Sequence, residues 1–482
     1  MLKKYSIVNF ILLVIIAILG VLLSVCPFNV PSTADRYNGF VGAIQKGIDL
    51  DGGVSAIYSA ELSNNNTSYS LTETIDNALS KVENVFSSNG SSRGENFPEL
   101  FVTRQGEKIR VEASGVDATD YVFDYLAEGQ EIFVTLEEIS DTVTNPTVYL
   151  NSNDIDYAYV GYDYDSSGYT VVLEFTNSGR IRLENMLTSA EEINSSNVYI
   201  YIEELTEDNL LSDTINIDDI DTTISFAIDS SSDYYSPNLV GNSVSASNGT
   251  AQARLAYIIT GGALGLELSY PETSNITALF GQNTLLYIGI ATIVSIVITL
   301  AFLIANYRDL GLLGCLSQIF FLVIFVFFMQ AIPFVVLNLA TLFGCIFAYL
   351  LSLVANVIIF ENIRSEYSIG KKIHLSFKGG MKKSLWPILD SHIIVALVGA
   401  IIWIFAPSTF NGFGVMLFMG AIISVFISLV VTRYLLNIYL PLNSTKSKRL
   451  GLYREKGVKE LKEETIISDV QPQNDAINSQ EE

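Results

Sequence analysis

Residues 337–364 read LNLATLFGCIFAYLLSLVANVIIFENIR, and no charged side chain occurs in this stretch before Glu361. A helix that crosses the hydrocarbon core of a bilayer needs about 20 mostly apolar residues. The residues ahead of Glu361 meet this requirement in length and in composition. The sequence therefore predicts a membrane-spanning helix here, and a chain organised around such helices.

Five further stretches meet the same requirement, so we expect a polytopic α-helical membrane protein with six transmembrane helices. The six predicted spans are Ile7–Cys26, Leu285–Ala305, Leu312–Ile332, Leu337–Phe360, Leu385–Ala406 and Phe413–Leu436. The first of them is expected to remain as an anchor. A cleaved signal peptide is the alternative, but no Ala-x-Ala site lies near its end, and Val25 stands where a lipoprotein signal ending at Cys26 needs a small residue.

Basic residues mark alternate connections between these helices, and this pattern predicts the orientation. They lie before the first helix, between the second and third, between the fourth and fifth, and after the sixth: Lys3, Lys4, Arg308, Arg364, Lys371, Lys372, Lys378, Lys382, Lys383, Arg433, Lys446, Lys448, Arg449 and Arg454. Short loops rich in Lys and Arg stay in the cytoplasm. We therefore expect both termini to be cytoplasmic and residues 27–284 to lie outside.

The charge of the chain is divided in the same way. The net charge is −24 although 49% of the residues are hydrophobic. Residues 27–283 contain 10 basic and 39 acidic residues, a net charge of −29, and the rest of the chain carries +5. This distribution excludes a single soluble globule. It also argues against nucleic acid as a partner, because the water-exposed part would repel phosphate.

The segment outside the membrane has mixed patterns of apolar residues. Val54–Tyr58 and Lys108–Ala113 are typical of strands, whereas Leu71–Phe86 has the spacing of an amphipathic helix. A large extracytoplasmic α+β domain is therefore expected. The predicted order is a cytoplasmic N-terminus, the first helix, this domain, a bundle of helices 2–6 and a cytoplasmic acidic tail, at 1–6, 7–26, 27–284, 285–443 and 444–482.

One stretch of this domain matches the spacing of a calcium-binding loop. Asp163, Asp165, Ser167, Gly168 and Glu174 stand at the positions that an EF-hand loop uses. An EF-hand also needs flanking helices, and the flanks here alternate as strands do. A β-hairpin explains the same residues without metal, so no metal site is predicted.

The sequence contains no pattern typical of an enzyme. It has no phosphate-binding glycine loop and no plausible Ser/His/Asp set, since His374 and His392 are its two histidines. The three cysteines, in or beside apolar runs, offer neither a disulfide framework nor a metal site. We therefore expect neither enzymatic activity nor a cofactor.

Several short motifs follow one another along the chain. Gly47-Ile48-Asp49-Leu50-Asp51-Gly52-Gly53-Val54 follows the first helix. Then come Tyr307-Arg308-x-x-Gly311, Ala355-Asn356-Val357-Ile358-Ile359-Phe360-Glu361-Asn362-Ile363-Arg364, Asp390 in the fifth helix, Gly412-Phe413-Gly414 and Thr432-Arg433. Each motif is weak alone, but their order and the topology are fairly specific together.

This set resembles the SecD/SecF family of Sec-translocon accessory subunits, part of the resistance-nodulation-division (RND) superfamily, from about residue 5 to 440. The resemblance implies half of an RND-type bundle in a bacterial cell membrane. It implies a protein that binds translocating polypeptides outside the membrane and assists their export, driven by the proton motive force. The implied partners are a SecF-like six-helix subunit, the SecYEG translocon and membrane lipid.

The chain departs from the family at one residue that matters for energy coupling. Val354 stands where the family has an aspartate implicated in proton passage, and Asn362 replaces the usual arginine after Glu361. Two other functions therefore stay open. The chain could be half of an RND-type exporter of lipids or small molecules, or a membrane scaffold that transports nothing.

Three polar residues in the spanning helices are the candidates for a proton relay. Asn356, Asp390 and His392 are expected at similar depth, where ionisable groups are costly and suggest function. The alternative is a packed group of hydrogen bonds, or an Asp390 that reaches Lys382 and Lys383.

The other candidate residues belong to the family motifs. Glu361 and Arg364 are expected to pair at the membrane interface. Gly47, Asp49, Leu50, Gly52 and Gly53 form a turn whose aspartates could contact a partner or substrate, although a purely conformational role is at least as well supported.

Overall fold

The structure is a computed structural model. It describes residues 2–29, 36–63, 70–89, 97–116, 122–140, 143, 145–163, 168–193, 195–217, 220, 222–227, 250–279, 281, 283–332, 335–443 and 447–454. The chain divides into two compact units. A membrane unit comprises Met1–Gln45 and Asn283–Glu482, and an outer unit comprises Lys46–Gln282. Most of the predicted acidic tail, residues 444–446 and 455–482, lies outside the described residues.

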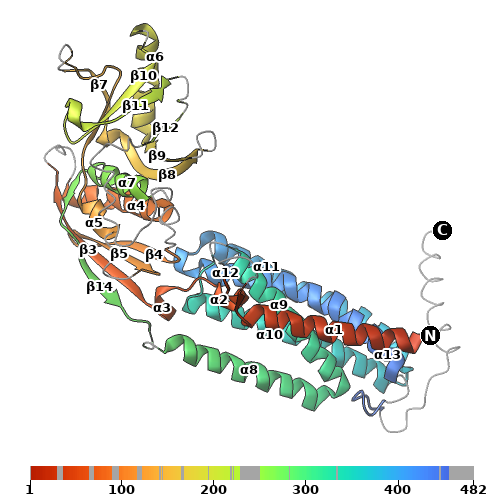
Figure 1. Ribbon diagram of the computed structural model, residues 1–482. Helices are drawn as coiled ribbons and strands as arrows, with labels where there is room; N and C mark the ends of the chain where they lie inside the picture. Colours follow the sequence, from red (N-terminus) through yellow and green to blue (C-terminus); the bar gives the residue numbers. More distant parts are fainter. Residues whose placement is uncertain are drawn as a thin grey trace, which may run out of the picture. The chain divides into compact units, whose positions relative to one another are not determined.

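The membrane unit is a bundle of long helices (Figure 1). Within the described residues, six helices are long and apolar enough to span a membrane, as the sequence predicts. The long elements are α1 (Leu2–Val25), α8 (Thr284–Tyr307), α9 (Asp309–Ala331), α10 (Leu339–Ser368), α11 (Ile373–Phe405) and α12 (Ser408–Phe426), which continues through the π-helix η7 (Ile427–Val431) into α13 (Thr432–Asn443). The short elements are β1 (Phe28–Asn29), β2 (Arg36–Tyr37) and α2 (Gly39–Gly42).

Small residues allow these helices to approach closely, because in lipid the helices associate by packing rather than by the hydrophobic effect. A Cβ atom added at Gly344 would lie 2.9 Å from the Phe413 carbonyl oxygen. One added at Gly420 would lie 2.3 Å from the Cβ of Ala348. Helices α10 and α12 therefore touch through their backbones.

The outer unit has two lobes. The first lobe is a five-stranded antiparallel sheet in the order β13-β3-β5-β4, with β14 also paired to β3, and with helices packed on one face (Figure 1). Its elements are α3 (Ile48–Asp51), β3 (Gly53–Leu62), α4 (Leu71–Asn89), β4 (Leu100–Gln105), β5 (Lys108–Ser114), α5 (Val122–Ala127), β13 (Leu266–Leu268) and β14 (Glu272–Ile276).

The second lobe contains two smaller antiparallel sheets, in the orders β11-β10-β6-β7 and β12-β9-β8. Its elements are β6 (Ile132–Thr135), β7 (Val148–Asn151), β8 (Ile155–Asp163), β9 (Gly168–Phe175), α6 (Asn177–Ile193), β10 (Asn197–Ile202), β11 (Leu210–Asn216) and β12 (Ile224–Phe226). Helix α7 (Thr250–Gly262) packs in both lobes, because Tyr257 lies in the core of the first and Ile258 in the core of the second. The α+β class predicted for this part is confirmed.

Lys81 of α4 also joins the lobes. Its ammonium group donates to the carbonyl oxygens of Ile155 (2.8 Å) and Ala263 (2.9 Å). Burial lowers the pKa of this lysine, while nearby Asp156 acts in the opposite direction. The two bonds fix α4 to the start of β8 and the end of α7, which favours a single rigid outer unit.

Candidate functional site

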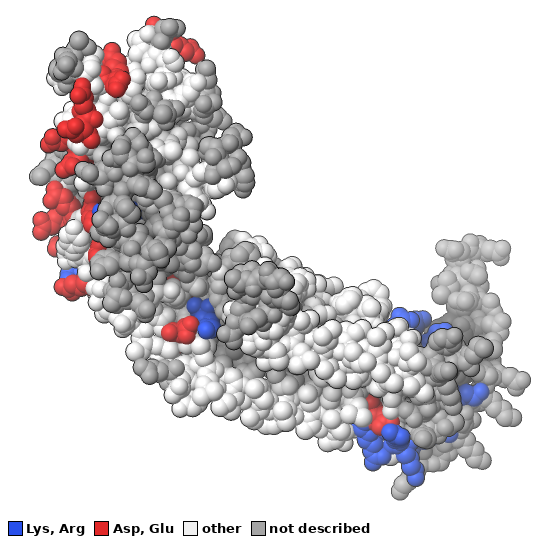
Figure 2. All heavy atoms as spheres, in the orientation of Figure 1, with Lys and Arg blue, Asp and Glu red and all other residues white. Residues whose placement is uncertain are grey.

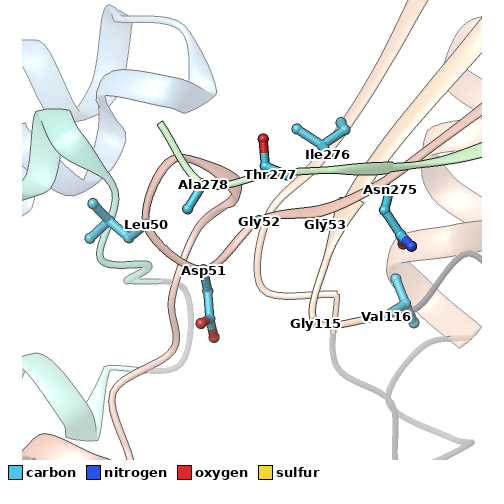
Figure 3. A pocket seen from close by; sticks show the side chains of 10 residues that line it. All are labelled: Leu50, Asp51, Gly52, Gly53, Gly115, Val116, Asn275, Ile276, Thr277 and Ala278. Carbon is cyan, nitrogen blue, oxygen red and sulfur yellow. The ribbon is translucent and has the colours of Figure 1, made fainter. Parts of the chain in front are cut away.

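The glycine motif forms a tight turn at the edge of the first lobe. Gly47 caps the single turn α3, and Gly52 ends it with φ of +82°. Beside this turn lies a pocket of about 420 Å³ (Figure 3). It is lined by Leu50, Asp51, Gly52, Gly53, Gly115, Val116, Asn275, Ile276, Thr277 and Ala278.

Two of these glycines are required by contacts with neighbouring strands. A Cβ atom at Gly52 would lie 2.5 Å from the Ile276 carbonyl oxygen of β14, and one at Gly53 would lie 2.2 Å from the Ala113 carbonyl oxygen of β5. No side chain fits at such separations from a backbone oxygen. The conformational role of this part of the motif is therefore sufficient to explain both glycines.

The aspartates of the motif differ in their surroundings. Asp51 is exposed and pairs with Lys46 at 3.4 Å. Asp49 contributes its backbone carbonyl, which accepts a hydrogen bond from the Leu279 amide, and Leu50 is buried. Glu99, which the sequence did not single out, accepts a hydrogen bond from the Ile48 amide at 2.8 Å. The pocket can accommodate a small polar group, and its described lining residues include no nucleophile–base pair.

In the membrane unit, both ring nitrogens of His392 have hydrogen-bond partners. His392 is 2% exposed, and its Nδ1 lies 2.7 Å from the Ile388 carbonyl oxygen. A carbonyl can only accept, so Nδ1 carries the proton. Nε2 lies 2.8 Å from the Ser424 hydroxyl, which can donate to it when the ring is neutral. Both ring nitrogens are satisfied without a charge, which assigns His392 to the packing of α11 on α12.

Asn356 belongs to a different polar group, formed by α9, α10 and α13. Its Oδ1 accepts from the Thr432 hydroxyl at 2.9 Å, and that hydroxyl lies 2.7 Å from Ser317. The neighbouring Gln318 donates to Ser352 at 3.2 Å. Thr432 follows directly after the π-helix η7, and its hydroxyl also reaches the Ile427 carbonyl at 3.2 Å. The group is fully buried and contains no titratable side chain.

Asp390 is exposed, and among the described residues it has no hydrogen bond or ion pair to either group. The expectation that Asn356, Asp390 and His392 form one polar group is therefore wrong in this structure. Asp390 and His392 are two positions apart in a helix that turns by about 100° per residue, so they point to nearly opposite sides. Val354 is also on the surface of the unit, 51% exposed. Among the described residues, neither Lys382 nor Lys383 pairs with Asp390.

A cluster of motif residues lies where α8 meets the end of α10. Arg364 pairs with Glu361 at 3.1 Å, donates from Nε to the Gly451 carbonyl at 3.2 Å, and hydrogen-bonds to the Asn306 carbonyl. The Tyr307 hydroxyl donates to Glu361 at 2.8 Å. We call these residues the Arg364 cluster. It holds the segment 447–454 against the bundle, so its role here is structural.

The same end of the bundle holds an ion pair that the sequence did not single out. Asp309 is buried, and it accepts from Arg449 at 3.0 Å and from the Tyr439 hydroxyl at 2.7 Å. The signal in the sequence was an acidic residue three positions before the predicted span Leu312–Ile332.

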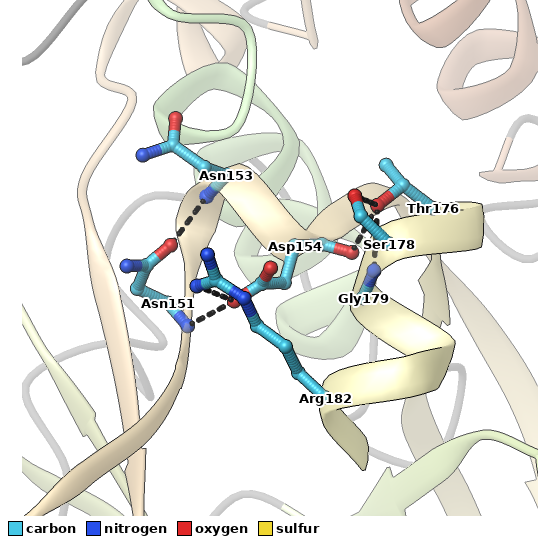
Figure 4. Close-up of polar contacts among 7 residues, drawn as sticks. All are labelled: Asn151, Asn153, Asp154, Thr176, Ser178, Gly179 and Arg182. Carbon is cyan, nitrogen blue, oxygen red and sulfur yellow. Dashed lines mark hydrogen bonds and ion pairs between the residues drawn. The ribbon is translucent and has the colours of Figure 1, made fainter. Parts of the chain in front are cut away.

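Sequence reasoning also missed a buried carboxylate in the second lobe, Asp154 (Figure 4). Its Oδ2 accepts from the Asn151 amide at 3.1 Å and lies 3.3 Å from Arg182. Its carbonyl accepts from Thr176, whose hydroxyl in turn caps α6 at Gly179. These contacts fix the start of α6 to the turn between β7 and β8.

The proposed hairpin at 157–175 agrees with the pairing of β8 and β9, which runs in register to Asp163 and Gly168. The tip, residues 164–167, lies outside the described residues. Among the described residues there is no group of three or more His, Cys, Asp or Glu side chains that could hold a metal ion.

The geometry at His392 leads to a testable prediction. His392→Phe should lower the unfolding free energy of the detergent-solubilised chain by about 1–3 kcal/mol, because it leaves the Ser424 hydroxyl without its acceptor. The double variant His392→Phe/Ser424→Ala should recover most of the loss, since both partners are then apolar. Thermal unfolding of the four proteins of this cycle measures the coupling. Additive losses would refute the assigned bond.

Comparisons with known proteins give consistent results. The chain is 27% identical to the protein translocase subunit SecD of Dehalococcoides mccartyi (strain VS) over 475 residues, which cover 92% of this chain and 97% of that protein. It is 30% identical to the protein translocase subunit SecDF of Bacillus subtilis (strain 168) over 185 residues, covering 38% of this chain and 25% of that one. No family model matches the chain.

A solved structure has a similar fold. The crystal structure of SecDF in its super-membrane-facing form aligns with a TM-score of 0.58 at 18% identity, covering 92% of this chain and 58% of that chain. A likeness at this identity shows the fold alone, and it agrees with a polytopic helical protein that carries a large sheet-rich domain. The motifs, the shared length and the fold together confirm the resemblance of this chain to SecD-type protein translocase subunits.

Proposed function

We propose that the chain is an accessory subunit of Sec-dependent protein export. It would bind translocating polypeptides outside the cell membrane and assist their passage. The observation that carries this proposal is the alignment with a SecD over 92% of this chain and 97% of the relative, since it includes the membrane helices and the outer unit alike. Binding and positioning of a polypeptide require no catalytic centre, so the proposed role is not enzymatic.

The proposed orientation puts both termini in the cytoplasm and the outer unit outside. Its support is that Lys and Arg side chains gather at the end of the bundle where α1 begins (Figure 2). The acidic side chains of the outer unit, visible in the same view, would face the export side. There they would attract the basic segments of an emerging polypeptide.

Cysteine labelling tests this orientation. In a chain without its native cysteines, Ser80→Cys and Ser365→Cys both create exposed thiols. An impermeant maleimide added to intact cells should modify the cysteine at 80 of α4 and leave the one at 365 of α10 unmodified until the cells are opened. Labelling at 365 in intact cells would contradict the orientation.

The proposed partners are a SecF-like six-helix subunit, the SecYEG translocon, the translocating polypeptide and membrane lipid. The support for these partners is the similarity to protein translocase subunits named SecD and SecDF.

The coupling to the proton gradient is a further part of the proposal. Val354 and Asn356 cannot exchange a proton, and His392 is satisfied in its neutral form. A route through this subunit would therefore use Asp390, unless the titrating groups lie in the partner. Asp390→Asn should then impair export and weaken its response to an uncoupler, whereas His392→Gln should not. Normal export in the Asp390→Asn variant would assign proton coupling to titrating groups in the partner subunit.

Co-purification tests the proposed function. A full-length, affinity-tagged chain isolated from gently solubilised membranes should retain SecY, SecE, SecG and a SecF-like protein, as identified by mass spectrometry. A chain that retains none of them would contradict the proposal. Recovery with components of a lipid or small-molecule exporter, or with no transport protein, would then favour the exporter half or the scaffold.

A further inference from the structure

Two sides of α11 are occupied by neighbouring helices of the same chain. Gly380 packs against the backbone of Ile363 in α10, and the Ser384 hydroxyl accepts from Asn362 of α10 at 3.0 Å. On the second side, Gly399 packs against the Gly414 carbonyl of α12, and His392 bonds to Ser424 of α12. These contacts fix the rotation of α11 about its axis.

The third side of α11 is exposed. It carries Lys383, Trp386, Asp390, Ile394, Leu397 and Ile401. We call this set the Asp390 face. Lys383 stands at the start of this face, and Asp390 is the one ionisable residue among its other members. Within the described part of the chain, Asp390 has no hydrogen bond or ion pair.

Asp390 lies well inside the depth of the bilayer. The bonds of Ser384 place that residue level with Asn362 and the Ile358 carbonyl, near the end of the apolar part of α10. Asp390 is six residues further along α11, or about 9 Å at ~1.5 Å per residue. Lys383 precedes Asp390 by seven residues, which is about 10 Å at the same rise per residue. It belongs to the charged end of the helix.

An exposed carboxylate at this depth is costly in lipid. Insertion scales place aspartate among the least favourable residues at the centre of a spanning helix. The flanking Ile394 and Leu397 side chains have no polar atoms, and among the described residues the Trp386 indole N–H makes no hydrogen bond to Asp390. A donor or a positive charge must therefore come from outside this chain if Asp390 is to be ionised.

We infer that the Asp390 face is the docking surface for a spanning helix of a different membrane protein, which places a basic side chain against Asp390. This inference rests on the proposed function for its partner, because a SecF-like subunit is the expected source of that helix. The inference adds to the proposed function the helix face that the partner contacts and the charge pair by which the partner recognises it. Asp390 is then a residue that positions and selects the partner.

Charge complementarity argues against a second copy of this chain as the occupant. The six predicted spans contain two basic side chains: Arg433, near the end of the last span, and His392, which is buried and bonded to Ser424 within the bundle. A symmetric contact through the Asp390 face would bring two carboxylates together, which is unfavourable in a medium of low dielectric constant. The partner is therefore a chain with a basic residue at mid-depth.

Photo-cross-linking in native membranes tests the inference. Ile394 lies one turn from Asp390 and is 62% exposed, and Ile298 of α8 is also 62% exposed, which makes it a matched control. Benzoylphenylalanine at position 394 should give a protein adduct on irradiation, and at position 298 it should not. The linked peptide should come from a spanning helix that has Lys, Arg or His within two turns of the attachment point.

Substitutions at Asp390 separate charge pairing from general proximity. Asp390→Leu should lower the yield of the adduct from position 394 at least tenfold, and Asp390→Lys should do the same. Exchange of the partner's basic residue for aspartate should restore the yield with Asp390→Lys alone. Lipid-only adducts at 394, a dimer of this chain, or an unchanged yield in Asp390→Leu would each overturn the inference.

The result can be read independently of the proposed function. If Sec components co-purify with the tagged chain but position 394 links only to lipid, the inference fails and the function stands. If position 394 links to a basic spanning helix of a protein outside the Sec machinery, the inference stands and the function fails.

Discussion

Gly52→Ala is expected to destabilise the outer unit by about 3 kcal/mol or more, which is enough to open the first lobe. The substitution combines an unfavourable backbone with a collision, because φ is +82° and the new Cβ would lie 2.5 Å from the Ile276 carbonyl of β14. Relief requires β14 to move away from β3. Limited proteolysis and thermal unfolding of the full chain in detergent measure the effect.

Gly106→Ala is the matched control for that prediction. Gly106 also has a positive φ, +69°, but an added Cβ would meet nothing within 4 Å. Gly106→Ala should therefore lower the unfolding free energy only by the cost of a positive φ in a residue with a side chain, about 1–2 kcal/mol. If both variants unfold alike, the close approach of Gly52 to β14 is not what the motif requires. A Gly52→Ala protein that stays folded but loses export would instead point to a binding role at the adjacent pocket.

Arg364→Lys is expected to release the segment 447–454 from the bundle. The guanidinium group bonds in three directions, to Glu361, Asn306 and Gly451, and lies 4.4 Å from the centre of the Tyr307 ring. A lysine ammonium keeps the charge but cannot span these partners. Loss of two such bonds should cost about 2–4 kcal/mol.

Hydrogen exchange measures this release. Amide exchange in 447–454 should accelerate in Arg364→Lys, because Leu450 and Leu452 are buried only while the segment is docked. Arg433→Lys is the control, since Arg433 is exposed and has no hydrogen bond or ion pair within the described part of the chain. Equal exchange in the two variants would show that the Arg364 cluster does not hold the segment.

The membrane helices were predictable because the requirement for about 20 apolar residues is a strong and local signal. The α+β class of the outer unit was predictable for a similar reason, since Leu71–Phe86 and Lys108–Ala113 follow the two simple periods of apolar residues. The division of the outer unit into two lobes was not. It depends on how α7 shares its faces between two cores, and on contacts such as that of Lys81 with Ile155 and Ala263, which are distant in sequence.

The candidate relay was misjudged because depth was considered and helical rotation was not. Asp390 and His392 are close in depth because they are neighbours on α11, but a difference of two residues turns the side chain by about 200°. The buried face of α11 is set by Gly380, Ser384 and Gly399, which contact α10 and α12. These small residues were visible in the sequence, and projecting them on a helical wheel would have separated His392 from Asp390.

The polar group around Asn356 could not be assigned from the sequence. It depends on the π-helix η7, which turns Thr432 toward Asn356 and Ser317. A π-helix shifts the register of a helix by one residue without a clear local signature. The pairing of Glu361 with Arg364, by contrast, follows from their spacing of three residues.

Protein export in living cells tests the central claim of this account most directly. In cells depleted of the chain, pulse-chase labelling of a secreted Sec substrate should show slower conversion of precursor to mature protein, and expression of the full chain should restore the rate. The Gly52→Ala chain, present at equal amount in the membrane, should fail to restore it. Unchanged precursor processing on depletion would contradict a role in Sec-dependent export.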